Sequence, residues 1–378
     1  MCGVFGAVLP GGEPTEAAAL VTLGLFALQH RGQESAGLAV SDGEQLMLYK
    51  DLGMISTVLD ERRVIGVRDP FGFRPLVLGR LPRTAAGDAD DGLWHGDDAE
   101  SGWCLSSETA ALDIVGAEYV RDVQPGEMVI LEPGQAPRSV RFADATPALC
   151  VFELIYFARP DSYMEGRNLY EARRKMGMQL AMEHPIDADL VMPVPDTGAP
   201  AAAGFAEASG LPYREGMYRN RYAGRTFIQP SAGLRHRGVT VKLNPLREVV
   251  AGKRLIVVDD SIVRGTTTKR IVDLLRRAGA TEVHVRISAP PIYHPCFYGI
   301  DTQIETELIA STHSEPEIRE FIGADTLGYL SIRGVLAALD LPYERFCFAC
   351  FDGHYPEPVP YDAASRKFVL EEPVTADA

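Results

Sequence analysis

The chain has 378 residues, 46% hydrophobic and 24% charged, a composition typical of a globular protein long enough for two domains. Its formal net charge of −15 disfavours a nucleic-acid partner, because an acidic surface repels phosphates. No apolar run reaches the roughly 20 residues that cross a bilayer, and no secretion signal opens the chain, so we expect a cytoplasmic protein without membrane association.

The first part of the chain combines short strand patterns with one helical stretch. Apolar residues recur at helical spacing between Thr15 and His30. Strand patterns follow at 37–40, 46–49, 64–67, 76–78 and 128–131. Because no helices separate these strands regularly, residues 1–146 are predicted to form an antiparallel α+β domain.

From about Asp187 onward, strands and helices alternate. Strands are predicted at 190–194, 254–258 and 283–287, and helices at 199–209 and 266–278. This order predicts an α/β domain with a parallel sheet, in which ligands bind at the carboxyl ends of the strands. We place this domain at 147–356 and a flexible tail at 357–378.

The most specific motif is Leu-Ile-Val-Val-Asp-Asp-Ser-Ile-Val-Arg-Gly-Thr-Thr-Thr at 255–268. An apolar strand delivers the carboxylates of Asp259 and Asp260, and the phosphate loop (residues 261–268) then opens a helix, whose N-terminal N–H groups bind phosphate. Two carboxylates beside bound phosphate require Mg²⁺ or ligand hydroxyls between them. A helix cap alone would need only one Asp, so the pair favours a ligand site.

This motif resembles the signature for phosphoribosyl pyrophosphate (PRPP) of the type I phosphoribosyltransferases. The resemblance implies that Asp259 and Asp260 hold Mg²⁺ and the ribose hydroxyls, and that the phosphate loop grips the 5′-phosphate. The residues implied in that loop are Ser261, Arg264, Gly265, Thr266, Thr267 and Thr268.

Two further segments resemble the amidotransferase members of that group. Residues 194–198 resemble their pyrophosphate loop, with Thr197 as a further Mg²⁺ contact. Residues 219–230 resemble their flexible loop, which closes over PRPP, and Arg225 is one of its three arginines. Taken by itself, such an arginine-rich loop fits a solvated segment equally well.

Cys2 follows the initiator Met, whose removal would leave a thiol and an α-amine on one residue. The amine, with a pKa near ~7.7–8.0, can serve as the base for that thiol. Position 2 alone would favour a buried structural cysteine, but its context resembles the Ntn-type glutamine PRPP amidotransferases. The resemblance implies Cys2 as the nucleophile and Arg31 and Gly32 as glutamine-binding residues. The segments that carry it are 2–6, 30–37, 67–76 and 106–110.

The sequence departs from that family inside the glutaminase domain. The family uses an Asn-Gly pair for the oxyanion hole and a His-Val-Arg-Tyr-Ser-Thr motif to hold the glutamine α-carboxylate. The asparagines of this chain are Asn168, Asn220 and Asn244, and none precedes a glycine. The family's central segment is predicted to be missing between about Ser56 and Val64. We therefore expect impaired use of glutamine.

The chain has six cysteines, which in a cytoplasmic protein do not indicate disulfides. Cys347 and Cys350 form a C-x-x-C pair that fits a redox motif, half of a zinc site or two buried thiols. With Cys150 and Cys296, this pair resembles the [4Fe–4S] ligands of the Bacillus-like subgroup of the family, with zinc as the chemical alternative. Cys104 remains as a structural cysteine.

The resemblance spans residues 2–56 and 64–356. It implies an amidophosphoribosyltransferase that forms 5-phosphoribosylamine and pyrophosphate from PRPP and glutamine-derived or free ammonia, in the first committed step of purine biosynthesis. It also implies a homo-oligomer inhibited by purine nucleotides. The alternative is a non-catalytic PRPP-binding regulator or a degenerate paralogue, which would not turn PRPP over.

Overall fold

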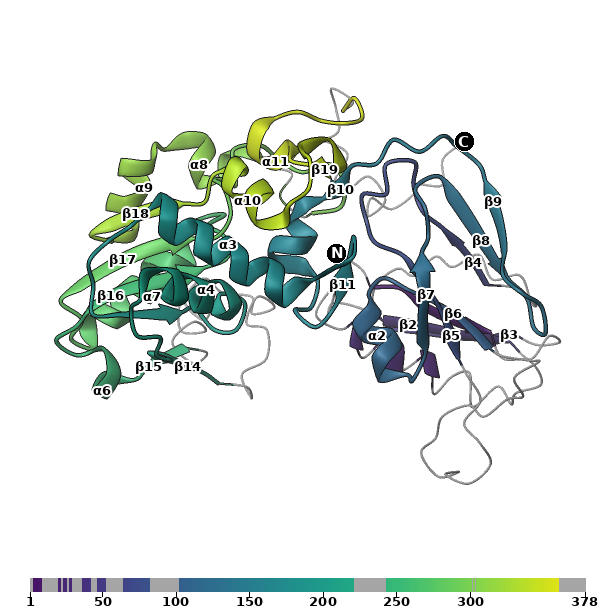
Figure 1. Cartoon of the computed structure of the whole chain (residues 1–378), viewed down its shortest axis with the longest axis horizontal. Coiled ribbons are helices and arrows are strands. Elements are labelled where there is room, and N and C mark those ends of the chain that lie inside the picture. Colours follow the sequence, from purple (N-terminus) through teal and green to yellow (C-terminus); the bar gives the residue numbers. More distant parts are fainter. Residues whose placement is uncertain are drawn as a thin grey trace, which may run out of the picture. The chain divides into compact units, whose positions relative to one another are not determined.

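The computed structural model describes residues 3–8, 20–21, 23–25, 27–28, 36–41, 46–51, 64–81, 102–220, 243–300, 302 and 304–359. The chain divides into two compact units (Figure 1). The first unit contains Met1–Leu169 and Glu344–Cys347, and the second contains Tyr170–Tyr343 and Phe348–Ala378. Within the described ranges, no helix combines the length and the apolar character needed to span a membrane.

The first unit consists mainly of antiparallel strands. One sheet has the order β1-β6-β5-β7, another has β4-β8-β9, and β2 pairs with β3. This confirms the antiparallel α+β architecture, and the strand patterns expected from 37 to 131 all overlap observed strands. The elements are β1 Phe5–Val8, β2 Ala36–Ser41, β3 Leu46–Asp51, β4 Val64–Val67, β5 Val77–Leu81, β6 Gly102–Ser106, α2 Thr109–Ile114, β7 Glu118–Asp122, β8 Glu127–Leu131, β9 Arg138–Arg141, β10 Leu149–Cys150, the π-helical turn Glu153–Phe157, β11 Tyr163–Met164, β12 Arg167–Asn168 and β19 Phe346–Cys347.

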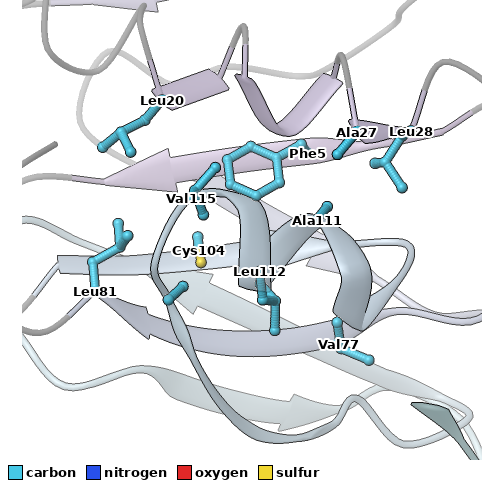
Figure 2. Close-up of a cluster of buried hydrophobic side chains, with 11 residues drawn as sticks. Phe5, Leu20, Ala27, Leu28, Val77, Leu81, Cys104, Ala111, Leu112 and Val115 are labelled. Atoms are coloured by element: carbon cyan, nitrogen blue, oxygen red, sulfur yellow. The ribbon is translucent and has the colours of Figure 1, made fainter. Parts of the chain in front are cut away.

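One hydrophobic cluster of the first unit joins its first sheet to helix α2 (Figure 2). Phe5 from β1 and Leu112 from α2 are both buried in it. The thiol of Cys104 lies in the same cluster, and burial raises its pKa to about 12. A thiol that stays protonated among apolar side chains is a packing group, as expected for a structural cysteine.

Two of the family-like segments in this unit, 67–76 and 106–110, contain buried charged side chains that hold nearby backbone in place. The guanidinium of Arg68 is buried and donates to the carbonyl oxygens of Val123 at 2.7 Å and Arg74 at 3.0 Å. The buried carboxylate of Glu108 accepts from the Arg159 N–H and from Ser162 Oγ, each at 2.8 Å. These side chains satisfy backbone groups that would otherwise be buried without partners, which is a structural role.

The second unit contains a parallel sheet with the strand order β13-β16-β17-β18. Helix α4 packs on β13 and β16, and α7 contacts β17. The predicted strands and helices of this part are confirmed to within a residue or two at their ends. The elements are α3 Leu169–Glu183, β13 Leu190–Pro193, α4 Ala199–Ser209, β14 Met217–Arg219, β15 Leu243–Pro245, α6 Arg247–Val250, β16 Arg254–Asp259, α7 Thr266–Arg277, β17 Glu282–Ile287, the 3-10 helix Glu305–Glu307, α8 Ile309–Thr312, α9 Glu315–Ile322, β18 Thr326–Tyr329, α10 Ile332–Leu339, the 3-10 turn Tyr343–Arg345 and α11 Ala349–Asp352.

Helices α3 and α4 approach each other through glycines. A methyl group at Gly177 would lie 1.8 Å from the carbonyl oxygen of Ala201, and one at Gly204 would lie 1.8 Å from that of Arg174. The absence of side chains at these two positions therefore sets the distance between the helices. Because α4 follows the first strand of the sheet, this packing fixes where the loop before α4 lies.

We predict that Gly204→Ala lowers the stability of the second unit by about 3 kcal/mol, because the added methyl group overpacks a backbone contact. The matched control is Gly210→Ala at the end of the same helix, where φ is +70° and no atom lies within 4 Å of the added carbon. That control should cost only the strain of the left-handed conformation, about 1 kcal/mol. Unfolding in urea measures both, and equal losses would contradict the packing argument.

Candidate functional site

Two loops of the second unit meet at one edge of the parallel sheet. Pro193 on β13 pairs with Val258 on β16, so the two strands end together. The pyrophosphate loop (residues 194–198) follows β13, and Asp260 with the phosphate loop follows β16. The N–H of Val194 donates to the carbonyl of Val258 at 2.8 Å, which carries the sheet pairing one residue further. The carboxyl edge of the sheet thus brings both predicted loops to one place.

Gly198 brings the pyrophosphate loop directly onto the end of β16. A side-chain carbon at this position would lie 2.5 Å from the carbonyl oxygen of Val258, so only glycine fits. Next to it, Thr197 Oγ1 donates a hydrogen bond to the carboxylate of Asp260. Ser261 Oγ donates to the other oxygen of the same carboxylate at 2.6 Å. The structure therefore joins Thr197, from the 194–198 segment, to Asp260 and Ser261 of the 255–268 motif.

The two adjacent carboxyl groups are buried. Asp259 is 9% exposed and Asp260 is 6% exposed, and the Asp260 N–H donates to Asp259 Oδ1 at 2.9 Å. Burial raises the pKa of Asp259 well above its ordinary value, and the neighbouring charge of Asp260 raises it further. Burial also raises the pKa of Asp260, against the lowering effect of the hydrogen bonds from Ser261 and Thr197 and of the charge of Arg173. Two desolvated acids side by side form a strong site for a cation or for hydroxyl donors.

The phosphate loop ends in an open helix N-terminus. Gly265 has φ +72°, a left-handed conformation that favours glycine, and it caps α7. The first helical hydrogen bond runs from the Lys269 N–H to the Gly265 carbonyl at 2.9 Å, so the preceding N–H groups of the first turn point out of the helix end. Thr266 and Thr267 are exposed there, while Thr268 is buried. This end suits an anion, since helix N-termini attract negative charge.

Two arginines at this edge are paired with carboxylates. Arg264 Nη2 forms an ion pair with Glu307. Arg219, at the end of β14, forms an ion pair with Asp196 at 2.6 Å, and these two side chains are 48% and 73% exposed. Exposed pairs of this kind contribute little to folding stability.

The predicted cysteine set is partly brought together. Cys150 on β10 and Cys347 on β19 are opposite one another in a parallel strand pair of the first unit. Cys296 and Cys350 lie in the second unit, where the carbonyl of Cys350 accepts from the N–H groups of Tyr293 and His294 at 3.0 Å. The four cysteines are 7–8% exposed. Across the described residues, no group of three or more His, Cys, Asp or Glu side chains that could hold a metal ion is found.

Several predicted site residues lie outside the described residues: Cys2, Arg31, Gly32 and Arg225. Two other residues at the site, Arg173 and Glu307, lie outside every segment that the sequence analysis singled out. For Arg173 a signal existed, because Leu169, Ala172, Met176 and Leu180 are spaced as the buried face of a helix that carries this arginine toward the core. No comparable signal marks Glu307, which lies 43 residues beyond Arg264.

Comparison with known proteins places this geometry in a family. A family model for the phosphoribosyl transferase domain matches residues 161–295. An amidophosphoribosyltransferase of Mycobacterium tuberculosis is 40% identical, with 98% of this chain and 89% of the relative covered. The chain belongs to the amidophosphoribosyltransferase family. The enzyme of Bacillus subtilis is 49% identical over 81% of this chain and 61% of its own length.

Amidophosphoribosyltransferases also match in three dimensions. A solved structure of the Bacillus subtilis glutamine PRPP amidotransferase, complexed with ADP and GMP, superposes with a TM-score of 0.82 and 37% identity. The match covers 96% of this chain and 98% of that one. The combination of the two units, and not only the transferase domain, is therefore that of the family.

The alignments also show that part of the family sequence has no counterpart here. The Mycobacterium tuberculosis match spans 490 positions, and this chain has 378 residues, so at least 112 positions (490 minus 378) lack a residue of this chain. The Bacillus subtilis match places 81% of the chain, about 306 residues, in 310 positions, which leaves little room for gaps. The gap of at least 112 positions thus falls mainly in the part of the alignment that contains the remaining fifth of the chain. The predicted break, at 56–64, borders and includes residues outside the described ones.

We predict that Asp259→Asn raises the thermal midpoint of the protein when no metal ion is added. The same substitution should lower PRPP turnover at least about 100-fold. The raised pKa means that the fold favours the protonated carboxyl group. The cost of ionising it grows as the pH rises above the ordinary Asp value of about 3.9, so the gain in thermal midpoint should be larger at pH 8 than at pH 5.

Asp189→Asn is the matched control with the opposite sign. Hydrogen bonds from the Arg254 backbone and side chain lower the pKa of Asp189, so its charged form is the one that the fold favours. Its substitution should lower the thermal midpoint at pH 8 and lose that effect as the pH falls below the ordinary Asp value. A destabilised Asp259→Asn variant at pH 8 would show that the buried pair is not under strain.

Proposed function

We propose that this chain catalyses the amidophosphoribosyltransferase reaction with free ammonia as the efficient nitrogen donor. In this reaction the ammonia nitrogen bonds to the anomeric carbon of PRPP, pyrophosphate leaves with the bonding electron pair, and a proton passes to solvent. The observation that carries the proposal is the buried carboxylate pair beside an open helix N-terminus, on a chain of this family. This arrangement supports binding of a phosphorylated sugar with hydroxyl groups.

The donor set at the sheet edge suits Mg²⁺. Asp259, Asp260 and Thr197 would offer oxygen atoms, and Mg²⁺ usually takes one or two carboxylates together with substrate phosphates. When bound, the ion would neutralise charge on the departing pyrophosphate. The phosphate loop would hold the 5′-phosphate through the N–H groups that begin α7 and the hydroxyls of Thr266 and Thr267. Arg219 and Arg225 would meet the pyrophosphate, because guanidinium groups match phosphate oxygens in charge and shape.

The second part of the proposal is that the glutaminase domain uses glutamine inefficiently. At least 112 positions of the relative's alignment have no residue in this chain, and the chain contains no Asn-Gly pair. Without an oxyanion donor and without the clamp for the glutamine α-carboxylate, the Cys2 thiol would attack an unpositioned and poorly stabilised substrate. The loss of one such donor alone typically lowers the rate by ~10²–10³. We infer that this chain keeps the family residues Cys2, Arg31 and Gly32 but does not hydrolyse glutamine efficiently.

We predict Mg²⁺-dependent release of pyrophosphate from PRPP with ammonia, and a rate with glutamine that is below about 1% of it. The assay compares both donors on protein purified without oxygen, and a Cys2→Ala variant should keep the ammonia rate. Equal rates with both donors would show that another residue provides the oxyanion hole. Binding of PRPP without turnover under either condition would favour a regulator or a degenerate paralogue instead.

We further propose that Cys150, Cys296, Cys347 and Cys350 hold a [4Fe–4S] cluster. All four are buried, Cys150 and Cys347 are paired in register on the parallel strands β10 and β19, and Cys296 Sγ accepts the Tyr298 N–H at 3.4 Å. Four thiolates are what such a cluster requires, and N–H donors to sulfur tune its reduction potential. Its role, by resemblance to the family, is structural. Zinc is the chemical alternative, since it also takes four thiolates.

Cys347→Ser should remove iron and inorganic sulfide from protein prepared without oxygen, whereas Cys104→Ala should retain both. The physical reason is that a hydroxyl replaces one thiolate ligand in the first variant, while Cys104 lies in a separate apolar cluster. Metal and sulfide analysis of the wild type should give about four of each per chain. Stoichiometric zinc without sulfide would replace the cluster with a zinc site.

The Bacillus subtilis enzyme of this family was solved with ADP and GMP. We infer that purine nucleotides bind this chain as well and inhibit it, and that it acts as a homo-oligomer like the family that it resembles.

A further inference from the structure

The phosphate loop is supported on one flank by the segment 305–321. The Ile309 N–H donates to the carbonyl of Val263 at 2.9 Å, which ties this segment to the loop backbone. Gly265 packs against the side chain of Ile309, because a carbon added at Gly265 would lie 2.9 Å from Ile309 Cδ1. The segment therefore touches the loop just where the backbone turns into the left-handed conformation before α7.

A second contact comes from helix α9. The ring of Phe321 would lie 3.2 Å from a carbon added at Gly265, so it forms part of the same wall. Lys269, one turn into α7, places its ammonium group 4.5 Å from the centre of that ring. An ammonium over an aromatic face is attracted by the ring quadrupole, so this contact ties the start of α7 to α9.

Glu307 contacts the side chain of Arg264 in the phosphate loop rather than the loop backbone. Its carboxylate pairs with Arg264 Nη2, with 44% of the Glu307 side chain and 57% of the Arg264 side chain exposed. A pair this exposed contributes little to folding stability. A guanidinium carries five N–H donors, so a contact made through one terminal nitrogen can orient the group while other donors point to an anion.

We propose that Glu307 is a positioning residue for PRPP, which holds Arg264 so that its guanidinium meets the ligand's phosphate at the start of α7. The proposal rests on the proposed function and extends it to a residue outside the phosphate loop. Without this carboxylate, the long Arg264 side chain would sample many conformations, and ligand binding would have to order it. The expected consequence is weaker PRPP binding with little change in the chemical step.

The test compares Glu307→Gln with wild type in Mg²⁺-dependent pyrophosphate release with ammonia. We expect a rise of about three- to tenfold in KM for PRPP, with kcat within about twofold and an unchanged thermal midpoint. Glu307→Asp, which keeps the charge, should restore part of the affinity. The matched control is Glu207→Gln, because Glu207 is 58% exposed and pairs with Arg174 at 2.5 Å in the same unit. It should leave KM unchanged.

A double-mutant cycle separates positioning from general support of the fold. In an Arg264→Ala background, Glu307→Gln should have no further effect on KM, because its target is gone. A further rise in that background, an unchanged KM in the single variant, or a lowered KM would each overturn the proposal. A lowered KM would mean that Glu307 competes with the phosphate for Arg264.

The outcome can be read independently of the proposed function. If wild-type protein binds PRPP and Mg²⁺ but does not turn over, the reaction assigned above fails. The Glu307 comparison then uses the dissociation constant for PRPP, measured by calorimetry on the same variants. The same three- to tenfold weakening is expected there, and its absence overturns the positioning role.

Discussion

The carboxylate pair at the end of β16 constrains the rest of the site. Asp259 and Asp260 are buried side by side, and both burial and mutual repulsion raise the pKa of Asp259. Such a pair is tolerated because hydroxyl donors from Ser261 and Thr197 and the charge of Arg173 act on Asp260. These partners come from three separate segments, so the whole carboxyl edge of the sheet is arranged around two acids that would be unfavourable without them.

The residues that make this arrangement possible are mostly small. Gly198 lets the pyrophosphate loop lie on the backbone of β16, and Gly265 provides the left-handed turn into α7. Gly177 and Gly204 let α3 and α4 approach, and α3 carries Arg173. Close backbone contacts of this kind leave few alternative arrangements, so they hold the site rigid. A site with buried like charges needs that rigidity, because relaxation would separate the acids or admit water.

The first unit shows how family-like motifs can persist for structural reasons. The buried Arg68 guanidinium and the buried Glu108 carboxylate each satisfy several backbone or hydroxyl groups. Neither residue needs a substrate to explain its place. The apolar cluster around Phe5 and Cys104 likewise packs the first sheet onto α2 (Figure 2). A domain can therefore keep its core and its motif turns in a sequence that has neither an Asn-Gly pair nor a His-Val-Arg-Tyr-Ser-Thr motif.

The sequence by itself determined the chemistry of the transferase site and the class of both domains. A run of buried aliphatic residues before Asp259 and Asp260, followed by Arg-Gly-Thr-Thr-Thr, is local information, and strand and helix periods are also read from near neighbours. Only the tertiary structure decided which distant groups meet those acids. Thr197 precedes Asp260 by 63 residues, and only the resemblance to the family implied that the two share one Mg²⁺ site. Glu307 follows Arg264 by 43 residues, and nothing in the sequence indicated that pairing. Such contacts depend on strand order and on close packing at glycines, which arise from the burial of the whole sheet rather than from any short stretch of sequence.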